Sequence, residues 1–315
     1  MKHLFIINPA AGGVKRRLKA IAQSIDNLMQ KRALDYEIYI TKAPMDARDK
    51  VWEEAKAMTP LRVYACGGDG TLNECVGGAA GLRHVAVTHY PCGTGNDFVK
   101  LFGKADSTLF KNLEALVDGF TMPLDLIDCN GRYGLNICSV GIDARIGADA
   151  HKYSGLPLIG GATGYLVSML LNVLRGINQP LSVTTPSERF EGGFALICAC
   201  NGRFYGGGFN PVPDAMPDDG LLDFLLVKAV SRLQFARLVG KYATGRFREL
   251  PELITHIRGK TMTIRSPETI VVNVDGEILR AKSVTFQIIP GAISFLFPCG
   301  MQFFNLDSSS DAICV

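Results

Sequence analysis

The feature that most constrains this chain is a glycine-rich loop between a buried strand and a helix. Residues 63–66 are small or apolar and predict a buried strand, which breaks at Gly67-Gly68-Asp69-Gly70. Leu72, Cys75 and Val76 then recur on one side of an expected helix. Glycines let a ligand approach the backbone closely, and the start of a helix presents N–H groups and the positive end of its dipole. The stretch therefore predicts a phosphate-binding loop.

Asp69 narrows the chemistry of this loop. The spacing matches neither the dinucleotide pattern G-x-G-x-x-G nor the Walker pattern G-x-x-x-x-G-K-[ST]. A carboxylate repels phosphate unless a cation lies between them, so Asp69 indicates a Mg²⁺ ion or a role in proton transfer. The simpler alternative is a strand-to-helix turn that Asp69 caps, because Gly and Asp are common turn residues.

Length and composition restrict the architecture and the partners. A chain of 315 residues favours two domains, and 47% hydrophobic with 20% charged residues is typical of a folded globular protein. A net charge of +3 gives no reason to expect a nucleic-acid partner. Nine cysteines without a paired C-x-x-C pattern suggest free thiols in a reducing cytoplasm, and no signal peptide or prenylation pattern is recognised.

Alternating strands and helices predict a doubly wound α/β domain with a parallel sheet in the first part of the chain. Ligands of such sheets bind at the carboxyl ends of the strands, where Asn8, Thr41, the Gly67 loop and Thr94 all lie. Four loops are therefore expected to converge on one crevice. The expected strands are 4–7, 36–40, 63–66 and 84–90, and the expected helices begin at Val14, span 47–57 and span 109–117.

The first helix has an unusual charge pattern. Lys15, Arg16, Arg17 and Lys19 crowd its first turns, where basic side chains oppose the helix dipole unless an anion lies nearby. These side chains form either a solvated basic face of the helix or, for at least one of them, part of a phosphate site beside the preceding glycines.

The second part of the chain predicts an antiparallel β domain with two helices, 162–174 and 232–242. Asn130-Gly131 between two apolar runs, 122–128 and 133–140, is a strong hairpin signal. The uncharged stretch 154–174 is broken by Pro157 and several glycines, so its continuous helix is too short to span a bilayer. The further expected strands are 181–185, 194–201, 221–227, 261–265, 270–275, 284–289 and 293–297.

Three groups of carboxylates are candidates for chemistry. Four of them crowd the turn 214–223, which can either fold around a hard cation or remain a solvated turn. Asp275 and Glu277 follow an apolar strand, where an Asp-Gly hairpin turn is the simpler explanation. Asp125 lies in an apolar strand at the domain junction and needs a partner, for which Lys15 is a candidate.

Together these motifs resemble the catalytic domain of the diacylglycerol kinase family. That family also includes sphingosine kinases, ceramide kinases and bacterial lipid kinases, and NAD kinases are distant relatives. The five matching motifs occur in the family's order and cover nearly the whole chain, with Cys92 as a mild departure. The motifs are Asn8-Pro9-Ala10-Ala11-Gly12-Gly13 with Lys15, then residues 67–74, 91–98, 218–223 and 275–277.

The resemblance implies an ATP-dependent lipid kinase with its active site between two domains. Residues 1–128 would form the α/β ATP-binding domain, and residues 129–298 would form a β-sandwich domain with helices that accepts the lipid. The last strand would return to the first domain, so that about 299–315 would also belong to that domain.

The same resemblance assigns roles to individual residues. Glu277 would accept the proton, and Lys15 with Asp125 would form a charged network around it. Asp69 as the base, with Glu277 organising Lys15, stays open. Asp219 with the backbone oxygens of Met216 and Leu221 would hold a structural Mg²⁺. The implied ATP-binding residues are Asn8, Pro9, Gly12, Thr41, Gly67, Gly68, Asp69, Gly70, Thr71, Asn73, Glu74, Thr94, Asn96 and Asp97.

Two alternative functions stay open at this point. The Gly67 loop also resembles that of NAD kinases and phosphofructokinases, so a kinase of a soluble substrate is the first, although the Asn8-Pro9 and 94–97 loops favour the lipid branch. A nucleotide-binding module without catalysis is the second, and the set Lys15, Asp69, Asp125 and Glu277 speaks against it. The expected partners are a lipid such as diacylglycerol and a second copy of the chain in a homodimer. The protein is expected in the cytoplasm, from which it would contact the membrane peripherally.

Overall fold

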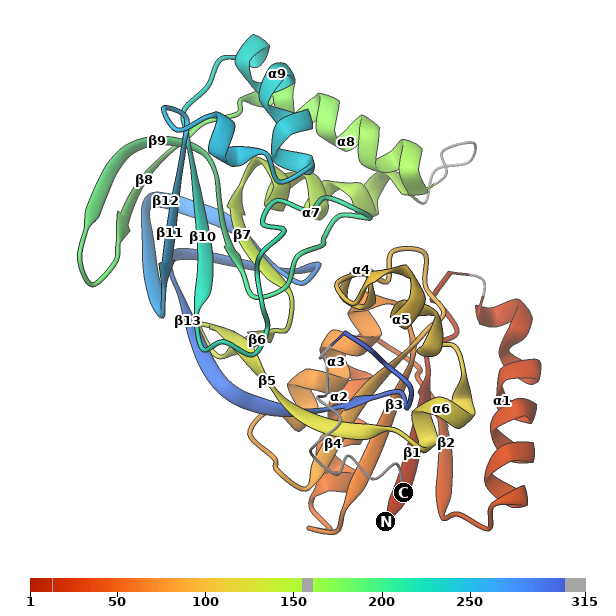
Figure 1. Ribbon diagram of the computed structural model, residues 1–315. Coiled ribbons are helices and arrows are strands. Elements are labelled where there is room, and N and C mark those ends of the chain that lie inside the picture. The colour runs from red at the N-terminus through yellow and green to blue at the C-terminus, as the bar shows by residue number, and fades with distance from the viewer. Residues whose placement is uncertain (13, 155–160, 304–315) are drawn as a thin grey trace. The chain divides into compact units, whose positions relative to one another are not determined.

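The computed structural model describes residues 1–12, 14–154 and 161–303, with the side chains of 150–167 left out (Figure 1). The chain forms two compact units. Unit 1 comprises Met1–Asp125 and Pro290–Val315, and unit 2 comprises Leu126–Ile289. Unit 1 is α/β and unit 2 is an antiparallel β domain with helices, as the sequence predicted.

Unit 1 is built on a parallel sheet in the order β13-β4-β3-β1-β2. Ile7 at the end of β1 lies opposite Ile40 in β2 and Cys66 in β3. The return of the last strand is confirmed, because Ser294 and Phe295 of β13 pair in parallel with β4. The strands are β1 (Lys2–Ile7), β2 (Tyr36–Ile40), β3 (Leu61–Gly67), β4 (Val85–Pro91) and β13 (Glu277–Phe297).

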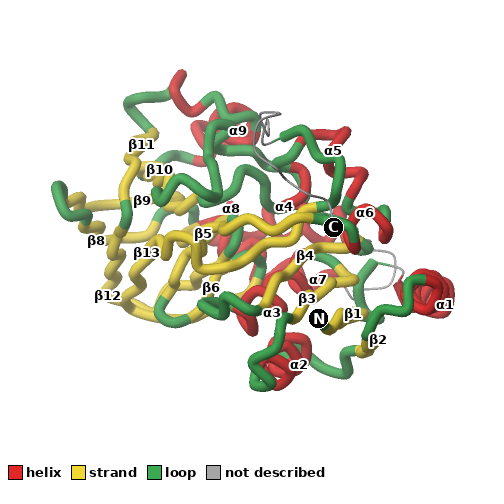
Figure 2. Tube along the Cα trace, turned by 60° about the horizontal axis from the view of Figure 1, so that its bottom comes forward, coloured by secondary structure: helices red, strands yellow, loops and turns green. Residues whose placement is uncertain are grey.

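Helices cover both faces of this sheet. Figure 2 shows α2 and α3 on one side of β1, β3 and β4, with α5 and α6 on the other. The helix expected over 109–117 is shorter, because Asn112 caps a new helix by accepting a hydrogen bond from the Ala115 amide. The helices are α1 (Val14–Lys31), α2 (Asp46–Ala55), α3 (Asp69–Ala79), α4 (Asp97–Lys100), α5 (Gly103–Leu109) and α6 (Leu113–Val117).

Unit 2 contains an antiparallel sheet in the order β11-β10-β9-β7-β12-β13, and β8 pairs with both β9 and β12. The expected runs 261–265 and 270–275 are one strand, since the register only shifts between Arg265 and Ile270. The runs 284–289 and 293–297 are likewise one strand, β13. The strands are β5 (Phe120–Cys129), β6 (Arg132–Gly134), β7 (Ile137–Gly141), β8 (Gln179–Thr184), β9 (Arg189–Cys200), β10 (Leu222–Lys228), β11 (Ile254–Gly259) and β12 (Thr261–Val274).

Two hairpin turns follow the sequence closely. Asn130 and Gly131 have φ of 53° and 83°, and Asp275 and Gly276 have φ of 49° and 97°. Positive φ at both central residues is the geometry of a type I′ turn, which Asn-Gly and Asp-Gly favour. The first turn joins β5 to β6 and the second joins β12 to β13.

The central strands of unit 2 are buried on both faces. Phe224 and Leu226 of β10 point into a core between strands, whereas Leu225 and Val227 contribute to a second core with the helices. Helix α7 was not expected, and it begins directly after Gly141, whose φ of 118° lets the chain turn beside Ala195. The helices are α7 (Ile142–Ser154), α8 (Gly161–Arg175), α9 (Arg232–Ala243) and the short 3₁₀ helix η1 (Phe247–Glu249).

Two further sequence expectations are tested at this level. Across residues 1–12, 14–154 and 161–303, no helix is both long enough and apolar enough to cross a membrane. The expectation of free thiols is confirmed for Cys66, Cys75, Cys92, Cys129, Cys138, Cys198 and Cys200, all of which are buried. Cys299 is an exception, because it is disulfide-bonded.

Candidate active site

The carboxyl ends of the parallel strands bring four loops of unit 1 to one edge of the sheet. The Thr41 amide donates to the Ile7 carbonyl at 3.0 Å, and the Asn8 amide donates to the Cys66 carbonyl at 3.1 Å. The Cys92 amide donates to the Gly67 carbonyl at 2.7 Å. Asn8, Thr41, the Gly67 loop and the loop after β4 are therefore neighbours.

Three glycines of these loops lie where the loops touch. A Cβ on Gly93 would lie 2.5 Å from the Gly68 Cα, and a Cβ on Gly12 would lie 3.1 Å from the Thr94 amide nitrogen. A Cβ on Gly95 would lie 2.7 Å from a carboxylate oxygen of Asp69. Packing therefore explains these glycines without any ligand. A Cβ on Gly70, in contrast, would meet nothing within 4 Å, so there is open space over the start of α3.

Asp69 joins the Gly67 loop to the loop after β4. Its Oδ1 accepts a hydrogen bond of 2.6 Å from the Asp97 amide, at the start of α4. The Asp97 carboxylate in turn pairs with Lys100 at 2.6 Å. Asn96, with φ of 49°, exchanges hydrogen bonds with the backbone of Gly93 and closes this loop.

Asn8 and Thr71 hold the other side of the Gly67 loop. The Asn8 Nδ2 donates to the Thr71 Oγ1 at 3.0 Å, and its Oδ1 accepts from the Ala10 amide at 2.9 Å. Thr71 is buried and packs on Gly67. Helix α3, which begins at Asp69, has no side-chain cap at Gly68, so the positive end of its dipole faces the loop. Pro9 and Asn73 are half-buried and Thr94 is exposed.

His89 lies within hydrogen-bond distance of the backbone of the Gly67 loop, a role that was not expected from the sequence. The ring is fully buried and its Nε2 lies 3.1 Å from the Gly67 carbonyl. Burial lowers the pKa of His89 to about 4, so the imidazole is neutral and donates Nε2–H to that carbonyl. The only sequence signal was a histidine inside an apolar strand.

Glu74 has a structural task. Its two carboxylate oxygens accept hydrogen bonds from the Met45 amide at 2.9 Å and the Ala47 amide at 3.1 Å, at the start of α2. A carboxylate at this position satisfies N–H groups of a helix start and complements its dipole. Glu74 thereby fixes the segment that follows Thr41.

The basic first turns of α1 lie beside the same loops. The Arg17 guanidinium donates to the Cys92 carbonyl at 3.4 Å, and Lys15 is exposed. Asp125 is 3% exposed, and its Oδ1 accepts from the Gly291 amide at 2.8 Å. A backbone amide therefore contributes to the stabilisation of this carboxylate. The charged network of Lys15, Asp125 and Glu277 stays a prediction.

Glu277 lies in unit 2 as the first residue of β13, opposite Val274. Its neighbour Asp275 anchors the turn, because the carboxylate accepts hydrogen bonds from three successive amides, those of Leu135, Asn136 and Ile137. The half-buried Glu277 side chain thus extends from a hairpin end that these hydrogen bonds anchor.

The acidic turn 214–223 is closed by basic side chains. Asp219 accepts from the Leu221 amide at 3.0 Å and pairs with the Arg258 guanidinium, which also lies 3.4 Å from Asp223. Arg203 donates to the Ala215 carbonyl and contacts the Met216 sulfur. Among the described residues, no cluster of three His, Cys, Asp or Glu side chains could hold a metal ion. The expected Mg²⁺ set relies on backbone oxygens and stays a prediction.

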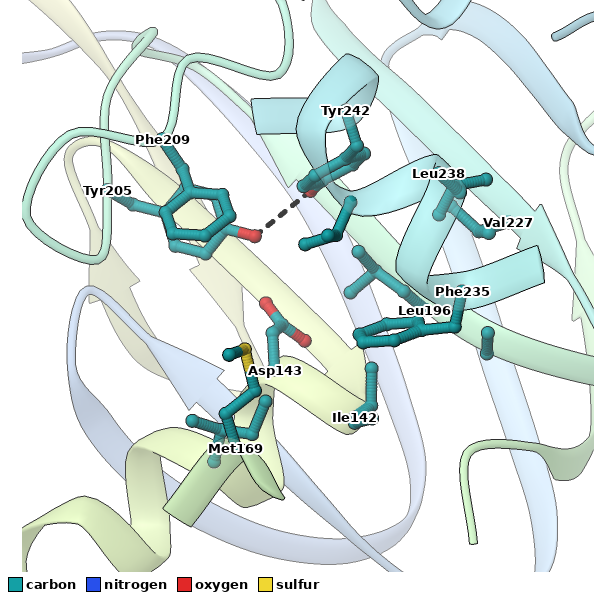
Figure 3. A pocket seen from close by; sticks show the side chains of 13 residues that line it. Ile142, Asp143, Met169, Leu196, Tyr205, Phe209, Val227, Phe235, Leu238 and Tyr242 are labelled. Atoms are coloured by element: carbon teal, nitrogen blue, oxygen red, sulfur yellow. Dashed lines mark hydrogen bonds between the residues drawn. The ribbon is translucent and has the colours of Figure 1, made fainter. Parts of the chain in front are cut away.

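Unit 2 contains a pocket whose lining residues were not singled out from the sequence. It lies among α7, α8, α9, β9, β10 and the loop at 201–210, and its empty volume is about 480 Å³ counted out to its open mouth. Figure 3 shows apolar side chains over most of its wall, with Tyr205 and Tyr242 on one side. Their hydroxyl groups lie 3.0 Å apart. A wall of this polarity suits an apolar ligand.

One carboxylate lies inside that pocket. Asp143 is 8% exposed, and burial raises its pKa to about 6. The sequence signal was a single acid shortly after the apolar strand 137–141. The position of this acid in the pocket depends on helix α7, which was not expected.

Comparison with known proteins places these two units. Residues 2–129 match the diacylglycerol kinase catalytic domain, and residues 136–297 match the YegS C-terminal NAD kinase beta sandwich-like domain. The chain belongs to the diacylglycerol kinase catalytic-domain family. The resemblance seen in the sequence motifs is confirmed.

Individual members of the family resemble most of the chain. A probable lipid kinase, YegS-like, from Pseudomonas aeruginosa is 30% identical over 84% of this chain and 85% of its own length. A protein of the same name from Shewanella frigidimarina is 29% identical over 78% of this chain and 79% of its own length. A candidate diacylglycerol kinase from Bacillus anthracis has the same fold, with a TM-score of 0.70 at 24% identity, covering 95% of this chain and 97% of that one.

Proposed function

We propose that this protein is an ATP-dependent lipid kinase that transfers the γ-phosphate to a lipid hydroxyl group, with diacylglycerol or a related lipid as the acceptor. The observation that carries the proposal is the apolar pocket of unit 2, in a chain whose family is defined by a kinase domain. A soluble acceptor such as a dinucleotide presents mostly polar surface and would leave such a wall unused.

ATP is proposed to bind at the carboxyl edge of the unit 1 sheet. The residues present fit a phosphate group, because the glycine loops meet there and the space over Gly70 is open. The amides at the start of α3 and the nearby Arg17 and Lys15 provide favourable charge for phosphate oxygens. A Mg²⁺ ion bound with the nucleotide supplies neutralisation of the phosphate charge. Asp69 is proposed to take part in holding that ion.

Glu277 is proposed as the proton acceptor. The acceptor hydroxyl of the lipid forms a bond to the γ-phosphorus while the bond from phosphorus to the ADP oxygen breaks, and the hydroxyl proton passes to the Glu277 carboxylate. The hydrogen bonds of Asp275 hold the turn from which this side chain extends. Asp69 as the base remains the second version of this step, with Glu277 then organising Lys15.

Contact with a membrane is proposed to be peripheral and to involve α8 and α9. Leu170, Leu174 and Leu233 are 60%, 58% and 64% exposed. Arg232 donates to the carbonyls of Val173 and Leu174, so these leucines lie on adjoining helix ends of unit 2 with basic side chains beside them. Such a surface suits insertion into an anionic bilayer surface. Replacing Leu170 and Leu174 by serine should reduce sedimentation with vesicles of phosphatidylglycerol, whereas unchanged binding would exclude this surface.

The NAD kinase alternative is kept as a control because the second matching family is described as NAD kinase beta sandwich-like. Phosphorylation of a lipid panel against phosphorylation of NAD separates the two. A nucleotide-binding module without catalysis would bind ATP and label neither. The homodimer and the cytoplasmic location remain expectations, which sedimentation velocity and cell fractionation can test.

A further inference from the structure

The pocket of unit 2 contains a carboxylate oxygen that the wall leaves unsatisfied. Asp143 is nine-tenths buried, and its Oδ1 accepts a hydrogen bond of 2.7 Å from the Ala144 amide. Its Oδ2 has no hydrogen-bond partner within the described part of the chain, and the same holds for the nearby hydroxyl of Ser139. Figure 3 shows the carboxylate pointing into the space between the helices and the two tyrosines.

Burial of such an oxygen is costly unless a ligand compensates for it. A buried polar group without a hydrogen bond destabilises the folded state, and a charge does so more strongly. Burial raises the pKa of Asp143 to about 6, while the hydroxyls of Ser139 and Tyr205 and the Ala144 amide favour the charged form to a smaller extent. Near neutral pH the group is therefore mostly an anion that only accepts hydrogen bonds.

The other groups that face Asp143 do not neutralise it. The hydroxyl of Tyr242 and the thiol of Cys200 have raised pKa values through burial, to which the negative charge of Asp143 adds, so both stay neutral. Arg145 follows Asp143 on α7, but its guanidinium donates to the carbonyls of Gly176 and Ile177. The hydroxyls of Ser139 and Tyr205 also face Asp143, but neither makes a hydrogen bond with Oδ2 in this structure, so a hydrogen-bond donor on a ligand would satisfy this oxygen.

The rest of the wall restricts what that ligand can be. Ile146, Leu196, Val227 and Leu238 offer no hydrogen bonds, so a head group with several polar atoms would leave most of them unpaired. A plain hydrocarbon chain fits the wall but leaves Oδ2 unpaired, and an ester carbonyl would place one acceptor against another. A chain with one isolated hydroxyl matches both the wall and the carboxylate.

We propose that this pocket selects a lipid whose hydrocarbon chain carries a hydroxyl group, and that the hydroxyl donates its hydrogen bond to Asp143. This inference rests on the proposed lipid kinase function, because the chain would belong to the molecule that is phosphorylated. Asp143 then determines which lipid is preferred and takes no part in phosphoryl transfer.

The test compares matched diacylglycerols that differ by one hydroxyl near the carboxyl end, in the middle or near the methyl end of one acyl chain. With wild-type protein, one member of the series should exceed the plain lipid in kcat/KM by about tenfold, the usual effect of one hydrogen bond to a charged group. In Asp143→Asn this ratio should fall several-fold, since the amide oxygen still accepts a hydrogen bond but no longer carries the charge that the donor prefers. The melting temperature of Asp143→Asn should be at least that of the wild type, because an unpaired buried charge is removed.

A second pocket variant serves as the control. Leu238→Ala enlarges the pocket on the opposite wall and should lower kcat/KM for plain and hydroxylated lipids together, keeping their ratio. The wild-type preference should also weaken between about pH 7.5 and about pH 5.5, because protonated Asp143 no longer acts purely as an acceptor.

Measuring the binding of the same lipids without ATP separates the proposed selectivity of the pocket from the proposed kinase function. Equal phosphorylation of all lipids, or an undiminished preference in Asp143→Asn, would overturn the selectivity and leave the kinase function standing. Selective binding of a hydroxylated lipid without any phosphorylation would contradict the kinase function and support the pocket assignment. Absence of both selective binding and phosphorylation would overturn both.

Discussion

The carboxylate of Asp69 accepts a hydrogen bond of 2.6 Å from the backbone N–H of Asp97. This contact joins two glycine-rich loops that are far apart in the sequence, and the close approach of Gly68 and Gly93 lies beside it. Asp69 therefore has a structural task as well as its proposed role beside the nucleotide phosphates.

Two substitutions of Asp69 should separate these tasks. In Asp69→Asn the side-chain oxygen can still accept from the Asp97 amide, so the melting temperature should change little. In Asp69→Ala the charge-assisted hydrogen bond is lost, which should cost about 1.5–3 kcal/mol of unfolding free energy. Phosphoryl transfer should fall about 100-fold or more in both variants, as measured by initial rates. Near-normal transfer by Asp69→Asn would assign Asp69 a purely structural role.

A pair of glycine variants should distinguish packing from ligand binding. Gly93→Ala places a Cβ against the backbone of Gly68 and should destabilise the fold by about 1–3 kcal/mol. Gly70→Ala meets nothing within 4 Å and lies in α3, so the fold should be unchanged or more stable by up to about 1 kcal/mol. Its methyl group nevertheless enters the space proposed for phosphate, and titration calorimetry should show about tenfold weaker ATP binding. Normal ATP affinity in Gly70→Ala would place the nucleotide elsewhere.

Glu277→Gln should abolish transfer and leave ATP binding nearly intact. The amide has the shape of the carboxylate but cannot accept the hydroxyl proton, so kcat should fall by about 10²–10⁴. Calorimetry with ATP gives the binding measurement. Glu268→Gln, an exposed position on β12, is the matched control and should behave as wild type. Lost ATP binding in Glu277→Gln would count against the assignment.

Asp143 should make the free energy of unfolding fall as pH rises. Its pKa is about 6 in the folded protein and ordinarily 3.8, so the folded state holds this proton more tightly than the unfolded chain. The contribution is fully present below about pH 4 and is lost as pH rises through about 6, and it amounts to roughly 3 kcal/mol.

His3 and His89 act with the opposite sign. Burial lowers the pKa of each to about 4, so these groups add stability as pH rises from about 4 to about 6.5. The difference between wild type and Asp143→Asn removes this background. Urea unfolding of both proteins at several pH values measures it, and a difference that is constant from about pH 4.5 to about pH 7 would refute the raised pKa of Asp143.

The acidic turn of unit 2 can be tested without any activity assay. Both Asp219 oxygens accept hydrogen bonds here, from Leu221 and Arg258, so a cation must compete with that guanidinium. If Mg²⁺ binds as the sequence motifs imply, it should raise the melting temperature of the wild type and more so of Arg258→Ala. Asp219→Asn should abolish the shift. Equal shifts in all three proteins would exclude this turn as the site.

The parts of the molecule that the sequence predicted depend on local patterns. Asn130-Gly131 and Asp275-Gly276 need positive φ, and the alternation of apolar runs with helices is enough to place Asn8 and Thr41 at strand ends. The glycine loops were recognised from local runs of glycines after strands, although the contacts of Gly93 with Gly68 and of Gly95 with Asp69 join residues far apart in the sequence.

The parts that escaped prediction depend on contacts between distant residues. Asp275 accepts from the amides of residues 135–137, and Glu74 caps a helix that precedes it in the chain. No local signal marks either role. The residues that line the pocket were missed because helix α7 begins directly after a strand at Gly141, and the position of Asp143 depends on that helix. The break expected in β12 is a register shift, which the pairing with β13 tolerates.

Transfer of labelled γ-phosphate from Mg-ATP to a panel of hydroxyl lipids in mixed micelles, with NAD as a soluble control, tests the central claim most directly. We expect label on a lipid, first of all on a diacylglycerol, and none on NAD. Label on NAD alone would contradict the lipid kinase proposal, and ATP binding without label on any acceptor would favour a nucleotide-binding module.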